Sequence, residues 1–323
     1  MPRSEALWYA AEGVAEIRPV DVSAPAAGDV RIAARYSGIS RGTERLLLQG
    51  RVPASEYQRM RCPHQEGAFP FPVKYGYALV GEIEDGPIAR IGETVFLLHP
   101  HQRQVCVPLA SVHALPTGLP PRRAALAANM ETALNVCWDA NVFPGDRILI
   151  VGGGVLGLLI AGIAARLPGA EVTVTDVNPA REAIARTLGA RYAPPDETPE
   201  NQDIVIHTSG SADGLRIALT AAGTEARVVE ASWYGDKSIA VSLGGAFHAR
   251  RLSLVSSQVG SVPAGRRARW SNARRMSKAL ELLRDDCFDI LITGEVAFAE
   301  APLELPKILA DNSAGLMTIL RYS

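Results

Sequence analysis

The sequence predicts a two-domain α/β protein in which a β-rich first part precedes a doubly wound parallel sheet. Three observations lead to this fold class. The chain has 323 residues, which at roughly 100–200 residues per domain suits two domains. Short runs rich in β-branched and aromatic residues, separated by Gly and Pro, fill residues 1–120. From Asp146 onward, continuous apolar strands alternate with helical segments, which is typical of a parallel sheet covered on both faces.

The elements are predicted in chain order. The β-rich part contains the runs VRIAARYSG, YALVGEIED, ETVFLLHP and QVCVPLASV, and residues 121–140 carry a helical pattern that starts with Pro. Strands and helices then alternate as RILIVGG, VLGLLIAGIAARL, EVTVTD, PAREAIARTLGA, DIVIHTSG, DGLRIALTAAG, ARVVEAS and LSLVSSQ. A basic helix with a solvated face is expected over 266–285, before the helix LELPKILAD and the strand LMTILRY. We therefore predict one domain over 1–120 with a C-terminal return of 300–323, and a second over 121–299.

Composition and charge exclude several classes of protein. Hydrophobic residues make up 47% of the chain, charged residues 21%, and the net charge is -1. No overall basic field favours nucleic acid or an anionic membrane. The N-terminus lacks an apolar signal core, and the apolar stretch 146–167 is interrupted by three consecutive glycines. The four cysteines share no CxxC spacing. We therefore expect a cytoplasmic protein with no membrane or nucleic-acid partner.

A glycine-rich turn predicts a Rossmann dinucleotide-binding unit. The turn follows an apolar strand at 148–151 and opens a helix, and an acidic residue ends the next strand, 19 residues beyond Gly157. Gly152 permits the tight turn, Gly154 lets a pyrophosphate approach the backbone, and Gly157 lets helix and strand pack closely. The helix N-terminus offers free N–H groups to the phosphates. The alternative is a Rossmann-like domain that holds no cofactor or another adenosyl compound.

The acidic residue, Asp176, predicts NAD(H) in preference to NADP(H). Its carboxylate would accept hydrogen bonds from the ribose hydroxyls and repel a 2′-phosphate, although Arg181 is close enough in sequence to weaken this preference. Ser209 follows the strand DIVIHT, at the carboxyl edge where such sheets bind ligands. The cofactor-binding residues predicted in this region are Gly152, Gly154, Val155, Leu156, Gly157, Asp176, Val177, Arg181 and Ser209.

The order of a β-rich part, a central Rossmann unit and a short return resembles the medium-chain dehydrogenase/reductase superfamily, whose first domain is GroES-like. The resemblance covers nearly the whole chain. Its local marks are SGISRGTE at 37–44, GYALVGEI at 76–83, IGETV at 91–95 and the glycine-rich turn. SGISRGTE together with QGRVP at 49–53 is similar to bacteriochlorophyllide dehydrogenase, which oxidises a hydroxyethyl group on a chlorin ring with NAD. That likeness is local, and Ala78 stands where that family tends to keep an acid, so the substrate stays open.

The resemblance implies a zinc-free member of the superfamily. Zinc-containing members carry Cys where this chain has Ser40, and Gly-His-Glu where it has GYA at 76–78; the four-cysteine structural lobe is absent too. Glu131 matches the position of a third metal ligand, but one carboxylate without a thiolate or imidazole is a poor zinc site. A different metal site would have to use histidines whose spacing fits no metal pattern, namely His64, His99, His101 and His113.

Without zinc as a Lewis acid, hydrogen-bond donors must polarise the substrate oxygen. By position in the family the catalytic candidates are Ser40, Thr43 and Tyr77, of which the first two could instead donate to the cofactor. Tyr77 is expected either to donate a proton, which requires a lowered pKa, or to form a packed aromatic wall. Arg41 is expected to pair with the pyrophosphate or to lie on the surface. The resemblance places Asn135 near the nicotinamide.

Three functions fit these residues. The first is a zinc-independent NAD(P)(H)-dependent alcohol dehydrogenase or ketone reductase acting on a small molecule. The second is an enone or quinone reductase, as many zinc-free relatives are, and the third is a non-catalytic dinucleotide sensor. The late strand LSLVSSQV is expected to lie at a sheet edge. Since an unpaired apolar edge is an aggregation hazard, and such strands in the superfamily commonly pair across a two-fold axis, we expect a homodimer.

Overall fold

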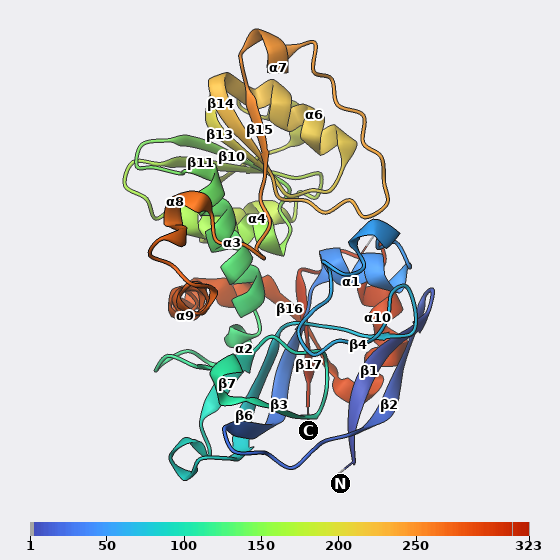
Figure 1. The fold of residues 1–323 in the computed structure, drawn as a ribbon. Helices are drawn as coiled ribbons and strands as arrows, with labels where there is room; N and C mark the ends of the chain where they lie inside the picture. Colours follow the sequence, from blue (N-terminus) through green and yellow to red (C-terminus); the bar gives the residue numbers. More distant parts are fainter. Residues whose placement is uncertain (1–2, 312, 323) are drawn as a thin grey trace. The chain divides into compact units, whose positions relative to one another are not determined.

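The computed structural model describes residues 3–311 and 313–322, which fall into two compact units. Unit 1 comprises Met1–Ala128, Leu280–Arg284 and Ile292–Ser323, and unit 2 comprises Asn129–Ala279 and Asp285–Leu291. The antiparallel strand pairs of the described chain lie in unit 1, and unit 2 is built on a parallel sheet (Figure 1). The predicted fold class, a mixed α/β protein with a β-rich part and a Rossmann-like part, is confirmed.

Two sheets form unit 1. The smaller has the strand order β2-β1-β5-β4, and the larger has the order β16-β17-β3-β6-β7-β9, with β8 also paired to β3. The pairing is antiparallel except between β16 and β17. The strands are β1 (Arg3–Ala11), β2 (Val14–Asp21), β3 (Asp29–Ile39), β4 (Glu66–Gly67), β5 (Val73–Lys74), β6 (Leu79–Asp85), β7 (Thr94–Leu97), β8 (Gln104–Pro108), β9 (His113–Ala114), β16 (Ile292–Ala297) and β17 (Met317–Arg321).

The C-terminal strand β17 lies between β16 and β3, where Thr318 faces Ile39 and Arg321 faces Tyr36. Residues 292–299 therefore belong to unit 1, because β16 hydrogen-bonds to β17. The helices of this unit are α1 (Arg41–Leu48), α2 (Pro121–Ala124) and α10 (Ala301–Ile308). Helix α1 was not anticipated in the β-rich part; it is short, and it buries three consecutive leucines, Leu46, Leu47 and Leu48.

The sheet of unit 2 is parallel throughout, with strand order β12-β11-β10-β13-β14-β15. From β10 the chain builds outward to β12 on one side and then to β15 on the other. The order therefore reverses between β10 and β13, and ligands of such sheets bind at the carboxyl ends of the strands at this switch point. The strands are β10 (Arg147–Val151), β11 (Glu171–Thr175), β12 (Arg191–Ala193), β13 (Gln202–His207), β14 (Ala222–Glu230) and β15 (Ser253–Ser256).

Helices cover the parallel sheet. Part of the core lies between α6 and the strands, where Leu149, Val205, Leu219 and Val228 are buried; full burial of such a side chain stabilises the fold by about 1.5–3 kcal/mol. No helix in the described part of the chain is long and apolar enough to cross a membrane. The helices are α3 (Ala127–Ala140), α4 (Val155–Ala164), α5 (Arg181–Thr187), α6 (Ala212–Ala221), α7 (Ala246–Ala249), α8 (Ala264–Arg267) and α9 (Asn272–Leu282).

The continuous basic helix predicted over 266–285 is wrong. The segment forms two helices, α8 and α9, that are separated around Trp270. The Trp270 ring lies 4.8 Å from the ring of Trp138, and the hydroxyl of Ser271 accepts a hydrogen bond from the Arg274 nitrogen at 3.1 Å, as at a new helix start. The aromatic contact and the new cap stop one helix and begin the next.

Candidate functional site

The glycine-rich turn joins β10 to α4 at the switch point of the unit 2 sheet. Gly152 has a φ of 113°, a conformation that favours glycine, and a Cβ atom there would lie 2.7 Å from the Ser209 nitrogen. A Cβ atom on Gly157 would collide with the Gly152 carbonyl oxygen and lie 2.8 Å from the Thr208 hydroxyl. A Cβ atom on Gly154, the N-cap of α4, would meet nothing within 4 Å. The turn therefore has no room for a side chain on the side that faces the end of β13, and it has free space beside Gly154 for a ligand.

Asp176 follows β11 and binds the same turn. One carboxylate oxygen accepts a hydrogen bond from the Gly153 nitrogen at 2.6 Å, and the other accepts from the Asn178 nitrogen at 2.8 Å. Arg181 packs beside them, since a Cβ atom on Gly153 would lie 3.1 Å from its Cγ. Burial lowers the pKa of Arg181, and the charge of Asp176 opposes that shift. Val177 is 86% exposed. The predicted acid and arginine therefore meet at the glycine-rich turn.

Three further predicted cofactor residues lie around the same edge. Val155 and Leu156 form the first turn of α4 and are half-buried, and Ser209 is exposed just beyond β13. A free helix N-terminus, a turn without side chains and an acid on the neighbouring strand together fit a dinucleotide. In this arrangement the phosphates would meet the N-terminus of α4, and Asp176 would accept from the adenosine ribose.

The three hydroxyl groups predicted to be catalytic come together in unit 1. Tyr77 donates to the hydroxyl of Ser40, and its oxygen lies 3.1 Å from that of Thr43. Ser40 is the N-cap of α1, and Thr43 belongs to its first turn. Burial raises the pKa of Tyr77 to about 12, although the hydrogen bonds with Ser40 and Thr43 act in the opposite direction. The lowered pKa considered for this residue is therefore not found, and the phenol stays protonated as a hydrogen-bond donor.

A buried acid, Glu44, holds Ser40 in place and was not recognised from the sequence. Glu44 Oε1 accepts from the Ser40 nitrogen at 2.6 Å, and Oε2 accepts from the Tyr9 hydroxyl at 2.5 Å. His101 Nε2 lies 3.1 Å from the same Oε2, and His101 Nδ1 lies 2.7 Å from the hydroxyl of Ser37. Glu44 and His101 are fully buried. The acid in SGISRGTE was the available signal, because two of its partners, Tyr9 and His101, lie far away in the chain.

Arg41 was expected to pair with the pyrophosphate or to lie on the surface, and Asn135 to lie near the nicotinamide; in the structure both side chains hydrogen-bond to other parts of the protein. The Arg41 guanidinium donates to carbonyl groups of the segment 313–315. Asn135 is fully buried; its carbonyl accepts from Arg275 at 2.5 Å, and its amide donates to Asp139 at 3.0 Å. Arg41 therefore anchors the C-terminal return, and Asn135 joins α3 to α9.

Comparison with known proteins relates this geometry to dehydrogenases. The family model "Alanine dehydrogenase/PNT, C-terminal domain" matches residues 139–228, which include the glycine-rich turn. D-guloside 3-dehydrogenase of Escherichia coli (strain K12) is 27% identical over 312 residues, covering 85% of this chain and 87% of that protein. L-threonine 3-dehydrogenase of Rhizobium rhizogenes is 29% identical over 119 residues, covering 37% of this chain. The match spans 34% of the length of that relative.

Solved structures match nearly the whole chain. A zinc-binding dehydrogenase from Sinorhizobium meliloti 1021 bound to NADP has a TM-score of 0.78 at 18% identity, covering 99% of this chain and 100% of that chain. An alcohol dehydrogenase from Escherichia coli CFT073 in complex with NADH has a TM-score of 0.78 at 18% identity, covering 99% of both chains. The chain therefore has the fold of these dehydrogenase structures. The two curated relatives are dehydrogenases, and the two solved structures hold NADP or NADH.

Three residues stand where the family resemblance would place zinc ligands, and each of them is hydrogen-bonded to other side chains. Two of them, Ser40 and Tyr77, hydrogen-bond to each other. The third, Glu131, lies 3.0 Å from Nε of the buried Arg275. Burial raises the pKa of Glu131, and the charge and hydrogen bond of Arg275 oppose that shift. Over residues 3–311 and 313–322, no group of three or more His, Cys, Asp or Glu side chains could hold a metal ion.

The histidines of unit 1 serve packing and hydrogen bonding. The rings of His64 and His99 stack with their centroids 4.9 Å apart. His99 Nδ1 lies 2.9 Å from the Pro100 carbonyl oxygen, and burial lowers the pKa of His99 to about 3. His101 belongs to the Glu44 network, and His113 lies in β9. A neutral, stacked His99 suits a packed interior.

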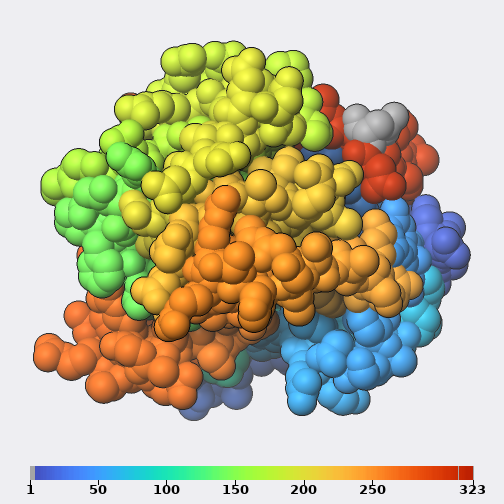
Figure 2. Space-filling model, turned by 90° about the horizontal axis from the view of Figure 1, so that it is seen from above, coloured from blue at the N-terminus to red at the C-terminus, as the bar shows by residue number. Residues whose placement is uncertain are grey.

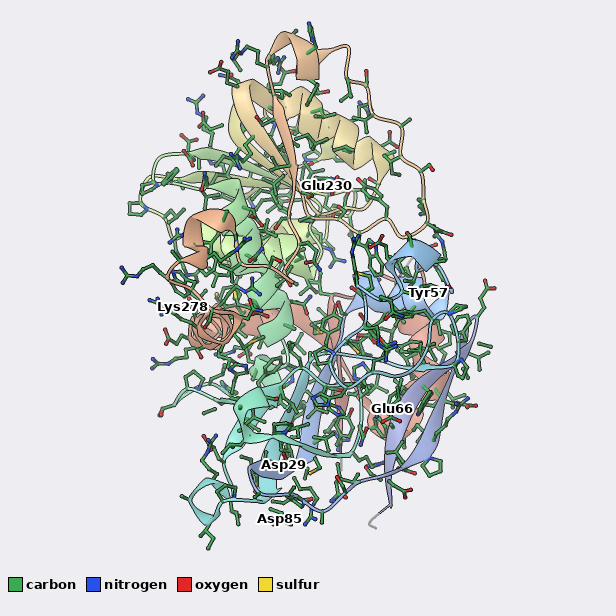
Figure 3. The ribbon with its side chains drawn as sticks, in the orientation of Figure 1. Asp29, Tyr57, Glu66, Asp85, Glu230 and Lys278 are labelled. Carbon is green, nitrogen blue, oxygen red and sulfur yellow. The ribbon has the colours of Figure 1, made fainter. Side chains whose placement is uncertain are left out.

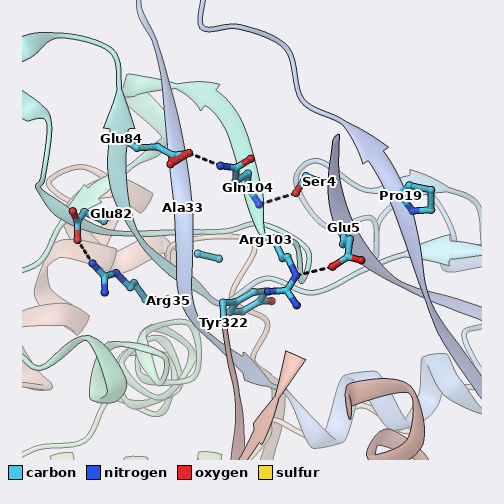
Figure 4. Close-up of a pocket in the computed structure, with 11 residues that line it drawn as sticks. Ser4, Glu5, Pro19, Ala33, Arg35, Glu82, Glu84, Arg103, Gln104 and Tyr322 are labelled. Atoms are coloured by element: carbon cyan, nitrogen blue, oxygen red, sulfur yellow. Dashed lines mark hydrogen bonds and ion pairs between the residues drawn. The ribbon is translucent and has the colours of Figure 1, made fainter. Parts of the chain in front are cut away.

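A pocket of ≈ 790 Å³ opens on unit 1 and is drawn in Figure 4. Its polar side chains bind one another: Arg103 donates to Glu5 at 2.7 Å, and Gln104 donates to Glu84 at 2.7 Å. None of the predicted catalytic residues lines it. Its charged groups already have partners, so we do not assign the site to this pocket.

Proposed function

We propose that this chain is a zinc-independent oxidoreductase that transfers a hydride between a nicotinamide cofactor and an alcohol or ketone. The observation that carries the proposal is the glycine-rich turn bound to Asp176 at the switch point of the unit 2 sheet. The nicotinamide, when bound, supplies the hydride chemistry. Similarity to D-guloside 3-dehydrogenase and L-threonine 3-dehydrogenase supports a secondary alcohol as the substrate class.

In this proposal the hydroxyl cluster of unit 1 holds the substrate oxygen. The Tyr77 phenol keeps its proton at neutral pH, since burial raises its pKa to about 12 from an ordinary value of 10 that is already well above neutrality. When a ketone is bound, the phenol can donate its hydrogen bond to the ketone oxygen instead of to the Ser40 hydroxyl. Ser40 and Thr43, which lie beside the phenol oxygen, orient it. Glu44 fixes the Ser40 backbone, so the donor is preorganised. Preorganised donors aimed at developing negative charge lower the barrier.

Zinc independence is supported by the donor set. Two hydroxyls and a carboxylate already paired with Arg275 stand at the ligand positions. Elemental analysis of the purified protein is expected to find well under one zinc per chain, and activity should survive a chelator. A stoichiometric zinc whose removal abolishes turnover would refute this part of the proposal.

The raised pKa of Tyr77 also favours a second candidate, an enone or quinone reductase. Conjugate hydride addition can leave the protonation of carbon to solvent, so a donor that keeps its proton is sufficient. A protonated Tyr77 would then only polarise the carbonyl. Both candidates use the same cofactor residues, and the substrate distinguishes them.

A substrate panel read by nicotinamide absorbance tests the proposed function. The panel should contain secondary alcohols and polyols with NAD, ketones with NADH, and enones and quinones with NADH. Turnover of an alcohol or ketone is the expected result, and turnover restricted to enones or quinones would favour the second candidate. Tight NADH binding with no turnover on any class would instead indicate a dinucleotide sensor.

A further inference from the structure

A buried histidine and a carboxylate lie behind an exposed serine at the switch point of unit 2. His207, the last residue of β13, is paired with Glu230, the last residue of β14, which Figure 3 labels. His207 Nδ1 lies 2.8 Å from Glu230 Oε2, and Nε2 lies 2.6 Å from the hydroxyl oxygen of Ser209. His207 is fully buried and Ser209 is exposed. The three side chains therefore connect the interior to the surface.

A glycine in α6 leaves room for this chain of hydrogen bonds. A Cβ atom on Gly214 would lie 2.6 Å from His207 Nε2 and would collide with the hydroxyl of Ser209. The Gly214 nitrogen donates to the hydroxyl of Ser211, the N-cap of α6, at 3.0 Å. The hydroxyls of Ser211 and Ser209 are 2.9 Å apart. Both serines are exposed, and the segments from α6 to α8, yellow and orange in Figure 2, form much of the face seen there.

The ionisation of the Glu230 carboxylate determines which atom donates in each hydrogen bond from His207 to Ser209 and Ser211. Burial by itself raises the pKa of Glu230, but hydrogen bonds from His207 and Ser232 outweigh it and hold the pKa below its ordinary value. An ionised carboxylate only accepts, so Nδ1 of His207 donates to it, and in the tautomer with its proton on Nδ1 the other ring nitrogen, Nε2, is an acceptor. Ser209 then donates its proton inward to Nε2, and Ser211 donates to Ser209. With these bonds made, each serine oxygen keeps a lone pair for a ligand.

Two adjacent acceptors suit a ligand that brings hydroxyl donors, and they disfavour a phosphate, which only accepts. We propose that the Glu230–His207 pair orients Ser209 and Ser211 as acceptors for the ribose hydroxyls of the second nucleotide half of the dinucleotide. His207 and Glu230 act as positioning residues in this assignment, which rests on the proposed function. Neither was among the predicted cofactor residues.

The strand order points to the second half of the cofactor. Asp176 follows β11, on one side of β10, and is placed for the adenosine ribose. Ser209 follows β13, on the other side of β10, and its nitrogen adjoins Gly152 of the pyrophosphate turn. A dinucleotide that crosses the switch point therefore reaches Ser209 with its second ribose.

Calorimetric titration with ADP, ADP-ribose and NADH measures what the second ribose contributes to binding. ADP lacks this ribose, and ADP-ribose carries it without the nicotinamide. Wild-type protein is expected to bind ADP-ribose more tightly than ADP. Ser209→Ala is expected to weaken the binding of ADP-ribose and of NADH roughly two- to tenfold, the range of one hydrogen bond. The affinity for ADP should not change. Ser277→Ala removes an exposed serine hydroxyl of α9 and should change none of the three affinities.

Glu230→Gln tests the positioning role with little change in shape. The Ser232 nitrogen donates to Glu230 Oε1 at 2.8 Å, so the glutamine oxygen should take that place and its amide nitrogen should face His207. The imidazole proton would then move to Nε2, and Ser209 would turn its own proton outward, a tautomer change of the kind that disables a catalytic triad. We expect the affinity for ADP-ribose to fall as it does in Ser209→Ala, and the affinity for ADP to stay unchanged. Nitrogen-15 NMR of His207 should show the proton on Nδ1 in wild type and on Nε2 in the variant.

The possible outcomes separate the two proposals. Equal losses for ADP and ADP-ribose, no loss for either, or an unchanged His207 tautomer in Glu230→Gln would overturn the orienting role and leave the proposed function intact. Failure of the wild-type protein to bind NADH and ADP would overturn the proposed function, and the positioning role with it.

Discussion

Nε of Arg275 donates to the Glu131 carboxylate at 3.0 Å, and both side chains are buried in unit 2. The same guanidinium donates to the carbonyl of Asn135 at 2.5 Å and to that of Val259 at 2.6 Å. Arg275 thus links α9 to α3 and to the segment that follows β15. The carboxylate that the family resemblance placed among metal ligands serves here as the counter-charge of an internal arginine.

Removing Arg275 should destabilise the protein strongly. Arg275→Leu leaves the Glu131 carboxylate buried without its counter-charge, and breaking a buried pair costs about 3–5 kcal/mol. The loss should be seen as a lower free energy of unfolding in urea at neutral pH. The double variant Glu131→Leu/Arg275→Leu should recover much of it, because no buried charge remains. Arg216→Leu, at an exposed ion pair of α6, is the control and should stay within about 0.5 kcal/mol of wild type. An Arg275→Leu variant as stable as wild type would contradict the role of this pair.

Asp176 should favour NADH over NADPH. The carboxylate would bind the ribose hydroxyls and repel a 2′-phosphate, so Asp176→Ala is expected to narrow the ratio of the two dissociation constants by about tenfold, or about 1.4 kcal/mol. Fluorescence titration with both cofactors measures the ratio, and Asp196→Ala, at an exposed acid, is the control. Tighter binding of NADPH by the wild-type protein would refute the preference and would point to Arg181 as the phosphate ligand.

The hydroxyl cluster should affect turnover more than cofactor affinity. Tyr77→Phe removes only the donor, so on a genuine substrate kcat should fall by at least about tenfold, within the range seen when a single oxyanion donor is lost. The NADH dissociation constant should hardly change. Ser40→Ala and Thr43→Ala should have smaller effects, and Tyr36→Phe in β3 is the matched control. Wild-type turnover in all three cluster variants would show that polarisation comes from elsewhere.

His99 should make the protein less stable in acid. Burial lowers the pKa of His99 to about 3 from an ordinary 6.5, so the unfolded chain binds the proton more tightly than the folded one. Its contribution is fully present above pH 6.5 and is lost progressively as the pH falls toward 3. At pH 5 the loss is roughly 2 kcal/mol, from 1.36 kcal/mol per pH unit.

The variant His99→Asn keeps a donor for the Pro100 carbonyl and removes the titration. Its free energy of unfolding should therefore change less between pH 7 and pH 5 than that of wild type. His248→Asn replaces an exposed histidine and should keep the wild-type dependence. The same pH dependence in His99→Asn and wild type would show that other groups cause the acid sensitivity.

Strand β15 should mediate a homodimer. It lies at the edge of the unit 2 sheet, where it pairs with β14, and its Leu254 is 36% exposed. An apolar edge strand is a template for pairing with another chain. Light scattering at micromolar concentration should give twice the chain mass, and Leu254→Lys should shift the mass toward the monomer. Wild-type protein that is monomeric at this concentration would contradict the proposal.

Local spacing was sufficient to predict the parallel sheet and the glycine-rich turn between β10 and α4. The glycines, the strand before them and Asp176 lie within one strand–helix–strand segment, where geometry follows from a few neighbouring residues. Sequence also brought Ser40, Thr43 and Tyr77 together, but through family position, because 37 residues separate Tyr77 from Ser40. The helix predicted over 266–285 failed because the Trp138–Trp270 contact, formed between distant segments, interrupts the local pattern.

The sequence by itself determined the class of fold, the strand–turn–helix at Gly152 and the acid that follows it, because these depend on residues close in the chain. Only the tertiary structure decided the partners of the buried charges. Glu131 meets Arg275 across 144 residues, and His207 meets Glu230 across 23. Such pairs depend on which strands and helices become neighbours, and a buried charge or imidazole takes whichever partner that packing supplies, since leaving it unpaired away from water is costly.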